Sequence, residues 1–300
     1  MKSLYKITFF TAVTIIMASS CGSKENTFDA TGFFEATEVT VSSEANGRIV
    51  SFDITEGQNI YADEILGCID SVQLYLSKLQ IEKNIEALKT SIPNVNTQTA
   101  SLREQIKKQK FERDRVENIV KSEAAPRKQL DDINSAISVM EEELKAAESN
   151  LENNIASVNA QIAAYEMQLA QIKDRLAKCM IISPIDGTVL SKYAQAGELA
   201  TAGKPLFKVA DTRHLYLRAY FTLSQLSNMK IGQKVKVMAD FGGNNIREYD
   251  GTITWISEKS EFTPKSILTK NDRANLVYAV KISIENDGYV KIGMYGEVIL

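Results

Sequence analysis

The sequence predicts an elongated α+β protein in which a small β domain is divided by a long antiparallel helical hairpin and followed by a small β-barrel. Two observations lead to this prediction. Residues 72–178 contain no glycine and only two prolines, and their apolar residues recur every three or four positions. The segments 43–69 and 183–209, on either side of this stretch, repeat each other in register without a gap, so that Ser43 corresponds to Ser183.

Residues 1–20 have the pattern of a secretory signal peptide. Two lysines precede an apolar run from Ile7 to Met17, which is too short to cross a membrane as a helix. The three small residues before Cys21 resemble the lipobox of bacterial lipoproteins, in which the cysteine is lipidated and becomes the first mature residue. This resemblance implies a lipid anchor on Cys21. Ordinary signal cleavage, which would remove Cys21 or leave it as a free thiol, is the alternative.

Residues 21–40 are expected to form a linker and one barrel strand, and the repeated segments then predict the split β domain. The two copies share residues at Ser43/Ser183, Gly47/Gly187, Ser51/Ser191, Gly57/Gly197, Ala62/Ala202 and Leu66/Leu206. Each copy consists of short strands between glycine turns and has too few apolar residues for a core of its own. We therefore expect residues 41–70 and 179–211 to fold together.

Residues 71–178 are predicted to form the helical hairpin, because their composition favours helix and their apolar spacing is typical of a coiled-coil seam. Pro126 is expected in the first turn of the second helix, so that the arms 72–125 and 126–178 are almost equal in length. Each arm should be about 75 to 80 Å long at 1.5 Å per residue. Pro93 should kink or break the first arm.

Residues 212–300 are predicted to form the small β-barrel. Short segments of alternating apolar and polar residues follow one another, separated by turns that contain glycine. The aromatic side chains of Trp255, Phe262 and Tyr278 are expected in the core of this barrel.

The glycine pattern of the split domain carries a family resemblance. Gly47-Arg-Ile-Val-x6-Gly57 and Ser183-Pro-Ile-Asp-Gly-Thr-Val-x7-Gly197 resemble the two halves of a biotinyl/lipoyl domain. In the carrier proteins a turn between the halves presents a modified lysine, but here the helical hairpin occupies that turn. A split lipoyl domain with an inserted hairpin is the layout of the HlyD-like periplasmic adaptors, also called membrane fusion proteins. The chain resembles this family over nearly its whole mature length.

The resemblance implies a non-enzymatic adaptor of a tripartite export or efflux system in the periplasm. It would link an inner-membrane transporter to a TolC-like outer-membrane channel and assemble as a homo-oligomeric, hexameric ring. A run in the barrel region is similar to adaptors of ABC-type exporters; it includes Phe262, Thr263, Pro264, Lys265 and Arg273. The alternatives are an adaptor of a proton-driven RND-type pump, a lipoyl or biotin carrier, and a passive coiled-coil spacer. The missing turn lysine counts against a carrier.

The family also suggests a docking site at the hairpin tip. Adaptors that dock TolC-type channels carry an Arg, a Leu four residues later and a Ser seven residues further. Arg115, Ile119 and Pro126 occupy these three positions. Proline supplies no hydroxyl, so the tip could dock through other contacts or on another channel. Alternatively, Arg115 belongs to a solvated helix face and has no docking role.

Cys68 and Cys179 flank the hairpin, one before the first arm and one after the second. The lipoyl fold would place them on neighbouring strands, where a disulfide is feasible if their Cα atoms approach within about 7 Å. Such a bond would close the hairpin as a loop in an oxidising compartment. Two buried free thiols are the favoured alternative.

The composition argues against several other functions. With 35 Lys and Arg against 38 Asp and Glu, the chain has no basic excess for nucleic-acid binding. His214 is the only histidine, which rules out a multi-histidine metal site within one chain. We find no phosphate-binding loop and no catalytic motif, and we expect neither an enzyme nor a cofactor. The cargo cannot be read from the sequence.

Overall fold

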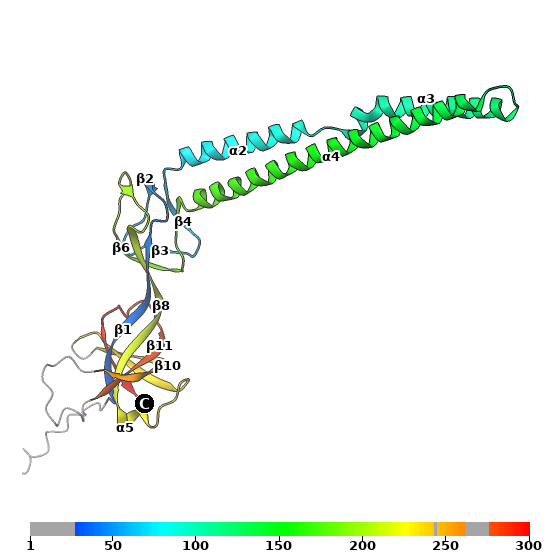
Figure 1. The fold of residues 1–300 in the computed structure, drawn as a ribbon. Coiled ribbons are helices and arrows are strands. Elements are labelled where there is room, and N and C mark those ends of the chain that lie inside the picture. The colour runs from blue at the N-terminus through cyan, green and yellow to red at the C-terminus, as the bar shows by residue number, and fades with distance from the viewer. Residues whose placement is uncertain (1–27, 243–244, 262–275) are drawn as a thin grey trace, which may run out of the picture.

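The computed structural model describes residues 28–242, 245–261 and 276–300. The predicted signal peptide, Cys21, the segment Phe262–Lys265 and Arg273 therefore lie outside the described residues. Figure 1 shows a β-rich part from which one long helical arm projects. The molecule is thus a mixed, elongated α and β structure, as the sequence predicts.

A closed antiparallel barrel forms the C-terminal part. Its strands pair in the order β1 (Ala30–Ser42), β12 (Tyr295–Ile299), β9 (Lys234–Asp240), β10 (Ile246–Glu261), β11 (Val277–Glu285) and β8 (Pro205–Thr222). The barrel closes because β1 pairs with both β12 and β8. A short helix, α5 (Leu223–Leu226), follows β8. Inward-facing aliphatic residues and two phenylalanines, Phe34 and Phe221, fill the core.

Trp255 does not lie in this core, so that part of the prediction was wrong. The β10–β11 register shifts between Ile253 and Trp255, and such a bulge changes which face the next side chain points to. Ile253 is fully buried, whereas the side chain of Trp255 is 41% exposed. Tyr278 is half-buried.

The two repeated segments lie in one body, a β sandwich above the barrel in Figure 1. Its first half holds β2 (Gly47–Phe52), β3 (Asn59–Ile60) and β4 (Ile65–Ile69), and its second half holds β5 (Met180–Ile182), β6 (Gly187–Lys192) and β7 (Leu199–Ala200). Both halves contribute to one core, in which Phe52 packs against Phe207 with ring centroids 6.0 Å apart. Apolar burial in this shared core joins the two distant segments.

Two long strands connect the sandwich to the barrel. β1 and β8 run through both bodies, so the domain boundaries predicted near residues 40 and 211 fall inside continuous strands. Their mutual register shifts between Ala36 and Thr37, where the strands pass from one body to the other. The polar run at residues 211–214 interrupts the apolar pattern of β8, so the sequence suggests a boundary where the strand is in fact continuous.

The arm consists of three helices. α2 (Val72–Ser91) and α3 (Val95–Lys121) pack in succession along α4 (Arg127–Ala177), which has 51 residues and is therefore about 75 Å long. The break between α2 and α3 contains Pro93, and the Asn94 side chain caps α3 by accepting a hydrogen bond from the Thr97 amide (3.1 Å). Pro126 is the N-cap of α4 rather than a first-turn residue.

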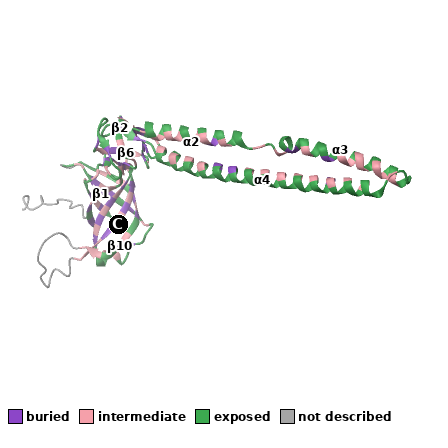
Figure 2. Cartoon of the chain, turned by 45° about the horizontal axis from the view of Figure 1, so that its top comes forward, coloured by how far each residue is buried: buried purple, intermediate pink, exposed green. Residues whose placement is uncertain are grey.

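Burial along the arm is confined to a narrow seam between the helices, as Figure 2 shows. The buried apolar side chains are Ile85, Ile106, Ile137, Val158 and Ile162. This spacing leaves most of the helix surface to solvent. None of the helices in the described ranges is long and apolar enough to cross a membrane.

Candidate functional site

The sandwich that carries the arm has an internal two-fold arrangement. The Gly57 amide donates to the Val189 carbonyl (2.8 Å), and the Gly197 amide donates to the Ile49 carbonyl (2.8 Å), which is the equivalent bond with the two copies of the repeat exchanged. Both glycines have positive φ, 84° and 93°, a conformation that favours glycine. The repeated pair Gly57 and Gly197 therefore marks the turns that interlock the two halves.

The base of the arm is built from two neighbouring strands. The Ile69 amide at the end of β4 donates to the carbonyl of Cys179 (2.8 Å), and Cys68 lies opposite Met180 in the β4–β5 pair. The chain therefore leaves the sandwich and returns to it at one point. This geometry places both ends of the arm on a rigid support.

Cys68 lies on β4 and Cys179 directly precedes β5, and both are free thiols. The sulfur atoms have different neighbours: Cys179 donates to the Arg175 carbonyl (3.3 Å), and the Cys68 sulfur lies 3.3 Å from the Ser51 hydroxyl. Burial, followed by the charge of Asp70, raises the pKa of Cys179. No disulfide joins these two cysteines at the base of the arm.

Two ion pairs fix the register of α3 against α4. Arg103 pairs with Glu148 (2.7 Å) and Lys110 pairs with Glu141 (2.6 Å), one heptad nearer the tip. All four side chains are partly exposed, so each pair adds about 0.5 kcal/mol or less to stability. These ion pairs set the alignment of α3 along α4 and contribute little to the stability of the helix pair.

The tip of the arm is a tight connection between α3 and α4. The Ala124 amide donates to the Ile119 carbonyl (3.1 Å), and the Ser122 hydroxyl donates to the Asn118 carbonyl (3.0 Å). Glu123 has φ of 58°, an uncommon conformation for a residue other than glycine. These bonds satisfy the last carbonyls of α3 and shape the tip.

The predicted docking residues all lie near the tip and are accessible. Arg115 and Ile119 are four residues apart on α3 and so share one face, while Pro126 begins the opposite helix. The Arg115 side chain is 68% exposed and makes one weak ion pair with Glu112 (3.7 Å). The structure thus leaves Arg115 open to contact with a partner.

Phe111 was missed in the sequence analysis. It lies four residues before Arg115, on the same face of α3, and its side chain is 74% exposed. An exposed phenylalanine beside an exposed arginine is a combination that protein interfaces favour. Its position outside the apolar seam could have been noticed from the spacing, because it falls neither three nor four positions from Ile106 or from Val116.

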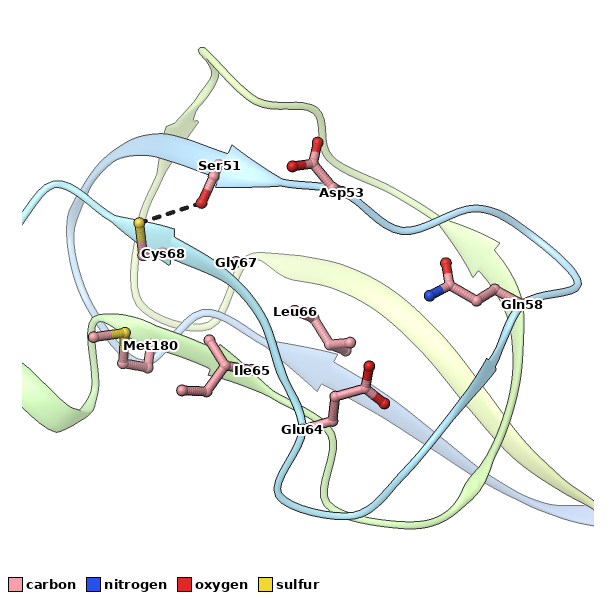
Figure 3. A pocket seen from close by; sticks show the side chains of 9 residues that line it. All are labelled: Ser51, Asp53, Gln58, Glu64, Ile65, Leu66, Gly67, Cys68 and Met180. Carbon is pink, nitrogen blue, oxygen red and sulfur yellow. Dashed lines mark hydrogen bonds between the residues drawn. The ribbon is translucent and has the colours of Figure 1, made fainter.

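A second accessible feature is a groove of about 400 Å³ on the outer face of β2, β4 and β5 (Figure 3). Asp53, Glu64, Ile65, Cys68 and Met180 line it. The groove is open to solvent, and its lining combines the exposed apolar side chains of Ile65 and Met180 with the carboxylates of Asp53 and Glu64. It contains no arrangement of side chains that resembles a catalytic centre.

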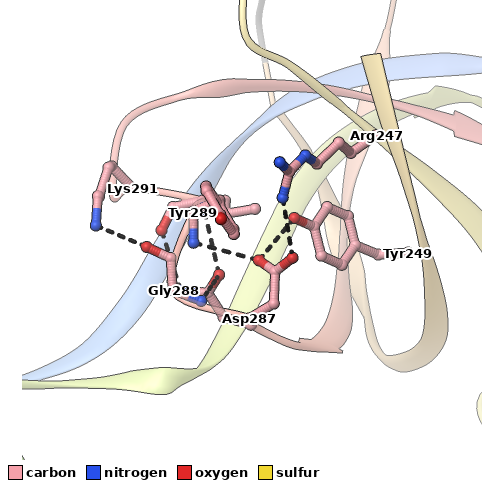
Figure 4. A network of polar contacts seen from close by, with 8 residues as sticks. Arg247, Tyr249, Asp287, Gly288, Tyr289 and Lys291 are labelled. Atoms are coloured by element: carbon pink, nitrogen blue, oxygen red, sulfur yellow. Dashed lines mark hydrogen bonds and ion pairs between the residues drawn. The ribbon is translucent and has the colours of Figure 1, made fainter. Parts of the chain in front are cut away.

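A polar network fastens the loop between β11 and β12 to the barrel (Figure 4). The Tyr249 hydroxyl donates to Asp287 (2.9 Å), and Arg247 pairs with the same carboxylate (3.3 Å). The Arg247 guanidinium also stacks 3.8 Å from the centre of the Tyr289 ring. These contacts stabilise the end of the barrel nearest the sandwich.

The described residues contain no group of three or more His, Cys, Asp or Glu side chains placed to hold a metal ion. His214 is half exposed and its Nδ1 lies 2.8 Å from Asp211. Partial burial opposes ionisation of Asp211, but hydrogen bonds from His214 and from backbone amides outweigh it and lower the pKa of that carboxyl. This pair is a local structural contact.

Comparison with known families gives one match over more than half of the chain. The family described as "RND MFP, barrel-sandwich hybrid domain" matches residues 37–212. This range covers the sandwich, the whole arm and the strands that lead to the barrel. A "UPF0194 membrane protein" of Yersinia pestis is 26% identical over 269 residues, which cover 83% of this chain and 81% of that protein. A protein of the same description from Citrobacter koseri is 24% identical and covers 90% of this chain and 88% of its own.

Two solved structures share the fold. The membrane fusion protein Spr0693 from Streptococcus pneumoniae R6 matches with a TM-score of 0.57 and 14% identity, covering 90% of this chain and 99% of that one. MacA from Actinobacillus actinomycetemcomitans matches with a TM-score of 0.53 and 20% identity, covering 92% of this chain and 79% of that one. At such low identity these likenesses concern the fold alone.

Proposed function

We propose that this chain, which belongs to the membrane fusion family described as "RND MFP, barrel-sandwich hybrid domain" and is an adaptor of efflux systems, links an ABC-type inner-membrane transporter to an outer-membrane channel. Membrane fusion proteins are non-enzymatic linkers, so this chain is not an enzyme. In the proposed assembly the barrel faces the transporter and the arm reaches towards the channel. The protein would transmit conformational change and seal a conduit.

The length and the exposure of the arm are the observations that support this proposal. A helix of 51 residues, fixed at its base and exposed at its tip, extends about 75 Å from the sandwich. Such a projection buries little surface of its own and therefore suits contact with a distant partner. The fold of MacA and Spr0693 agrees with this arrangement.

The choice of transporter rests on sequence resemblance. The run Phe262–Lys265 and Arg273 resembles adaptors of ABC-type exporters, whereas the description of the matching family names the RND type. An RND-type pump is therefore the second candidate. Covalent capture of the adaptor with its neighbours in the membrane, followed by mass spectrometry, distinguishes a transporter with an ATP-binding subunit from an RND permease.

We further propose a lipid anchor on Cys21, a periplasmic location and a homo-oligomeric ring of six copies. The small residues before Cys21 support the anchor. Several acyl chains would hold the protein at a membrane surface, because each buried CH₂ contributes roughly 0.8 kcal/mol. The mass of the mature N-terminal peptide tests this directly, and an unmodified N-terminus beyond Cys21 would contradict it.

Arg115→Glu tests docking through the tip. We expect export and co-purification of the channel to fall at least about tenfold, because the substitution places a negative charge on an exposed docking face. Lys145→Glu is the matched control: it makes the same change of charge on α4, at a side chain that is 79% exposed. Cellular level and thermal unfolding should be unchanged in both variants. Normal export by Arg115→Glu would count against tip docking.

A further inference from the structure

Because of the internal repeat, the two sheets of the sandwich have equivalent strand pairings, and each sheet presents one outer face. In the pair β4–β5, Ile65 lies opposite Ile182 and Cys68 opposite Met180. In the pair β8–β1, Pro205 lies opposite Ser42 and Lys208 opposite Thr40, which are the equivalent pairings with the two copies of the repeat exchanged. Because the shared core lies between the two sheets, their outer faces point in opposite directions.

One outer face, here called the acidic face, is lined by Asp53, Glu64, Ile65, Cys68 and Met180 (Figure 3). Glu64 accepts a hydrogen bond from the Tyr61 amide (2.8 Å). No ion pair within the described parts of the chain involves Asp53 or Glu64. Ile65 is 65% exposed and Met180 is 46% exposed. Two carboxylates without a cationic partner in those parts thus border an exposed apolar surface.

The other outer face, here called the basic face, is lined by Thr40, Tyr193, Lys204, Pro205 and Lys208 around a groove of about 470 Å³. In the repeat these positions correspond, in the same order, to Met180, Asp53, Glu64, Ile65 and Cys68. Tyr193 is 47% exposed. Where the acidic face has carboxylates and aliphatic residues, the basic face has ammonium groups, lysine stems, a proline ring and a phenol.

Both lysines already have partners within the chain. Lys204 contacts Glu198 (2.9 Å) and the Leu199 carbonyl (3.0 Å), and Lys208 contacts Glu38 (2.9 Å). An ammonium group carries three donors, so each lysine retains capacity for another carboxylate. The lysine stems can cover apolar surface while their charged ends stay at the rim.

We propose that the acidic face of one copy binds the basic face of the next copy. Glu64 and Asp53 would meet Lys204 and Lys208, while Ile65 and Met180 would pack against Pro205, Tyr193 and the lysine stems. Because the two faces lie on opposite sides of one body, the contact is head-to-tail and repeats from copy to copy, so that it closes into a ring if the rotation allows. This inference rests on the ring assembly proposed above and names the surfaces that form it.

Charge reversal tests the interface with the full mature chain in sedimentation velocity experiments. Glu64→Lys and Lys204→Glu should each weaken self-association about tenfold or more, because each places like charges opposite one another. An equal mixture of the two variants should associate like the wild type, since alternating copies again bring one carboxylate to one ammonium group at every contact. Glu142→Lys and Lys107→Glu, on exposed faces of the arm, are the controls and should change nothing.

Carbodiimide cross-linking supplies a second measurement that needs no variant. In a mixture of isotopically labelled and unlabelled wild-type chains, we expect bonds between the Asp53 or Glu64 peptides of one chain and the Lys204 or Lys208 peptides of another. The proposal would be overturned if the wild type is monomeric, if the single variants associate normally, or if their mixture fails to associate. It would also be overturned if the cross-links are confined to other surfaces. Export by Arg115→Glu is measured separately, so failure here leaves the adaptor function standing.

Discussion

At the scale of single residues, Glu297 on β12 shows how the barrel tolerates a poorly placed charge. Burial, followed by the charge of Asp240, raises the pKa of its carboxyl. A raised pKa in the folded state means that the native protein binds this proton more tightly than the unfolded chain. The carboxylate therefore disfavours the fold above its folded pKa, and this penalty disappears as the pH falls below the ordinary value of 4.5.

Glu297→Gln should consequently stabilise the protein at neutral pH. We expect the free energy of unfolding to rise by about 0.5 kcal/mol at pH 7, since the amide keeps the shape without the charge. Urea unfolding at pH 7 and at pH 4 measures the effect, which should be absent at pH 4. Glu152→Gln, at an exposed position on α4, serves as the control with no expected change. A loss of stability at pH 7 would contradict this account.

The two cysteines illustrate what sequence can and cannot provide at this scale. Their positions on either side of the hairpin, together with the family resemblance, predicted that they would lie on neighbouring strands, and the β4–β5 pairing brings them there. Whether they bond depends on the direction of two side chains. Cys179 turns towards the Arg175 carbonyl and Cys68 towards the Ser51 hydroxyl, and no spacing of residues encodes that choice.

At the scale of elements, the arm is the part that the sequence described best. The spacing of apolar residues predicted helices with one seam, and Pro93 predicted the break in the first arm. The cap made by Asn94 and the exposed position of Phe111 were not foreseen. The cap depends on where α3 begins, which the apolar spacing fixes only to within about one or two residues. The place of Phe111 outside the seam, in contrast, is present in the spacing.

The seam itself should carry most of the stability of the arm. Ile162 on α4 packs with Ile85 of α2 and is 7% exposed, whereas Met167 on the same helix is 65% exposed. Ile162→Ala should therefore cost about 2 to 4 kcal/mol, and Met167→Ala less than about 0.5 kcal/mol. Hydrogen exchange of α2 and α4 amides reports this local opening. Equal effects of the two substitutions would mean that α2 and α4 are not packed as described.

At the scale of the whole molecule, the repeat of segment 43–69 in segment 183–209 was the most informative pattern in the sequence. It predicted that two distant segments form one body, because glycine turns and apolar positions recur together, and both segments share one core. The repeat could not show that β1 and β8 run on into the barrel. Nor could it show that the two sheets present opposite chemistry outwards, since this depends on which side chains the strands turn away from the core.

This architecture makes the arm dispensable for folding of the β part. The Ile69 amide already bonds to the Cys179 carbonyl (2.8 Å), and Leu74 alone among the described arm residues packs partly against the sandwich core. Replacing residues 72–177 with a short glycine-rich loop should therefore leave the melting temperature of the β part unchanged or higher, because closing a shorter loop costs less entropy.

The matched control for this deletion replaces residues 183–209 with the same loop. It removes Val189, Leu206, Phe207 and Val209 from the shared core, and the chain should then fail to give a cooperative thermal transition. Circular dichroism and thermal melting measure both variants, and export by the arm deletion should be lost because the tip is absent. If the arm deletion also fails to fold, the hairpin contributes to the core in a way that the contacts at its base do not account for. If it folds, the two β segments alone specify the body that the arm projects from.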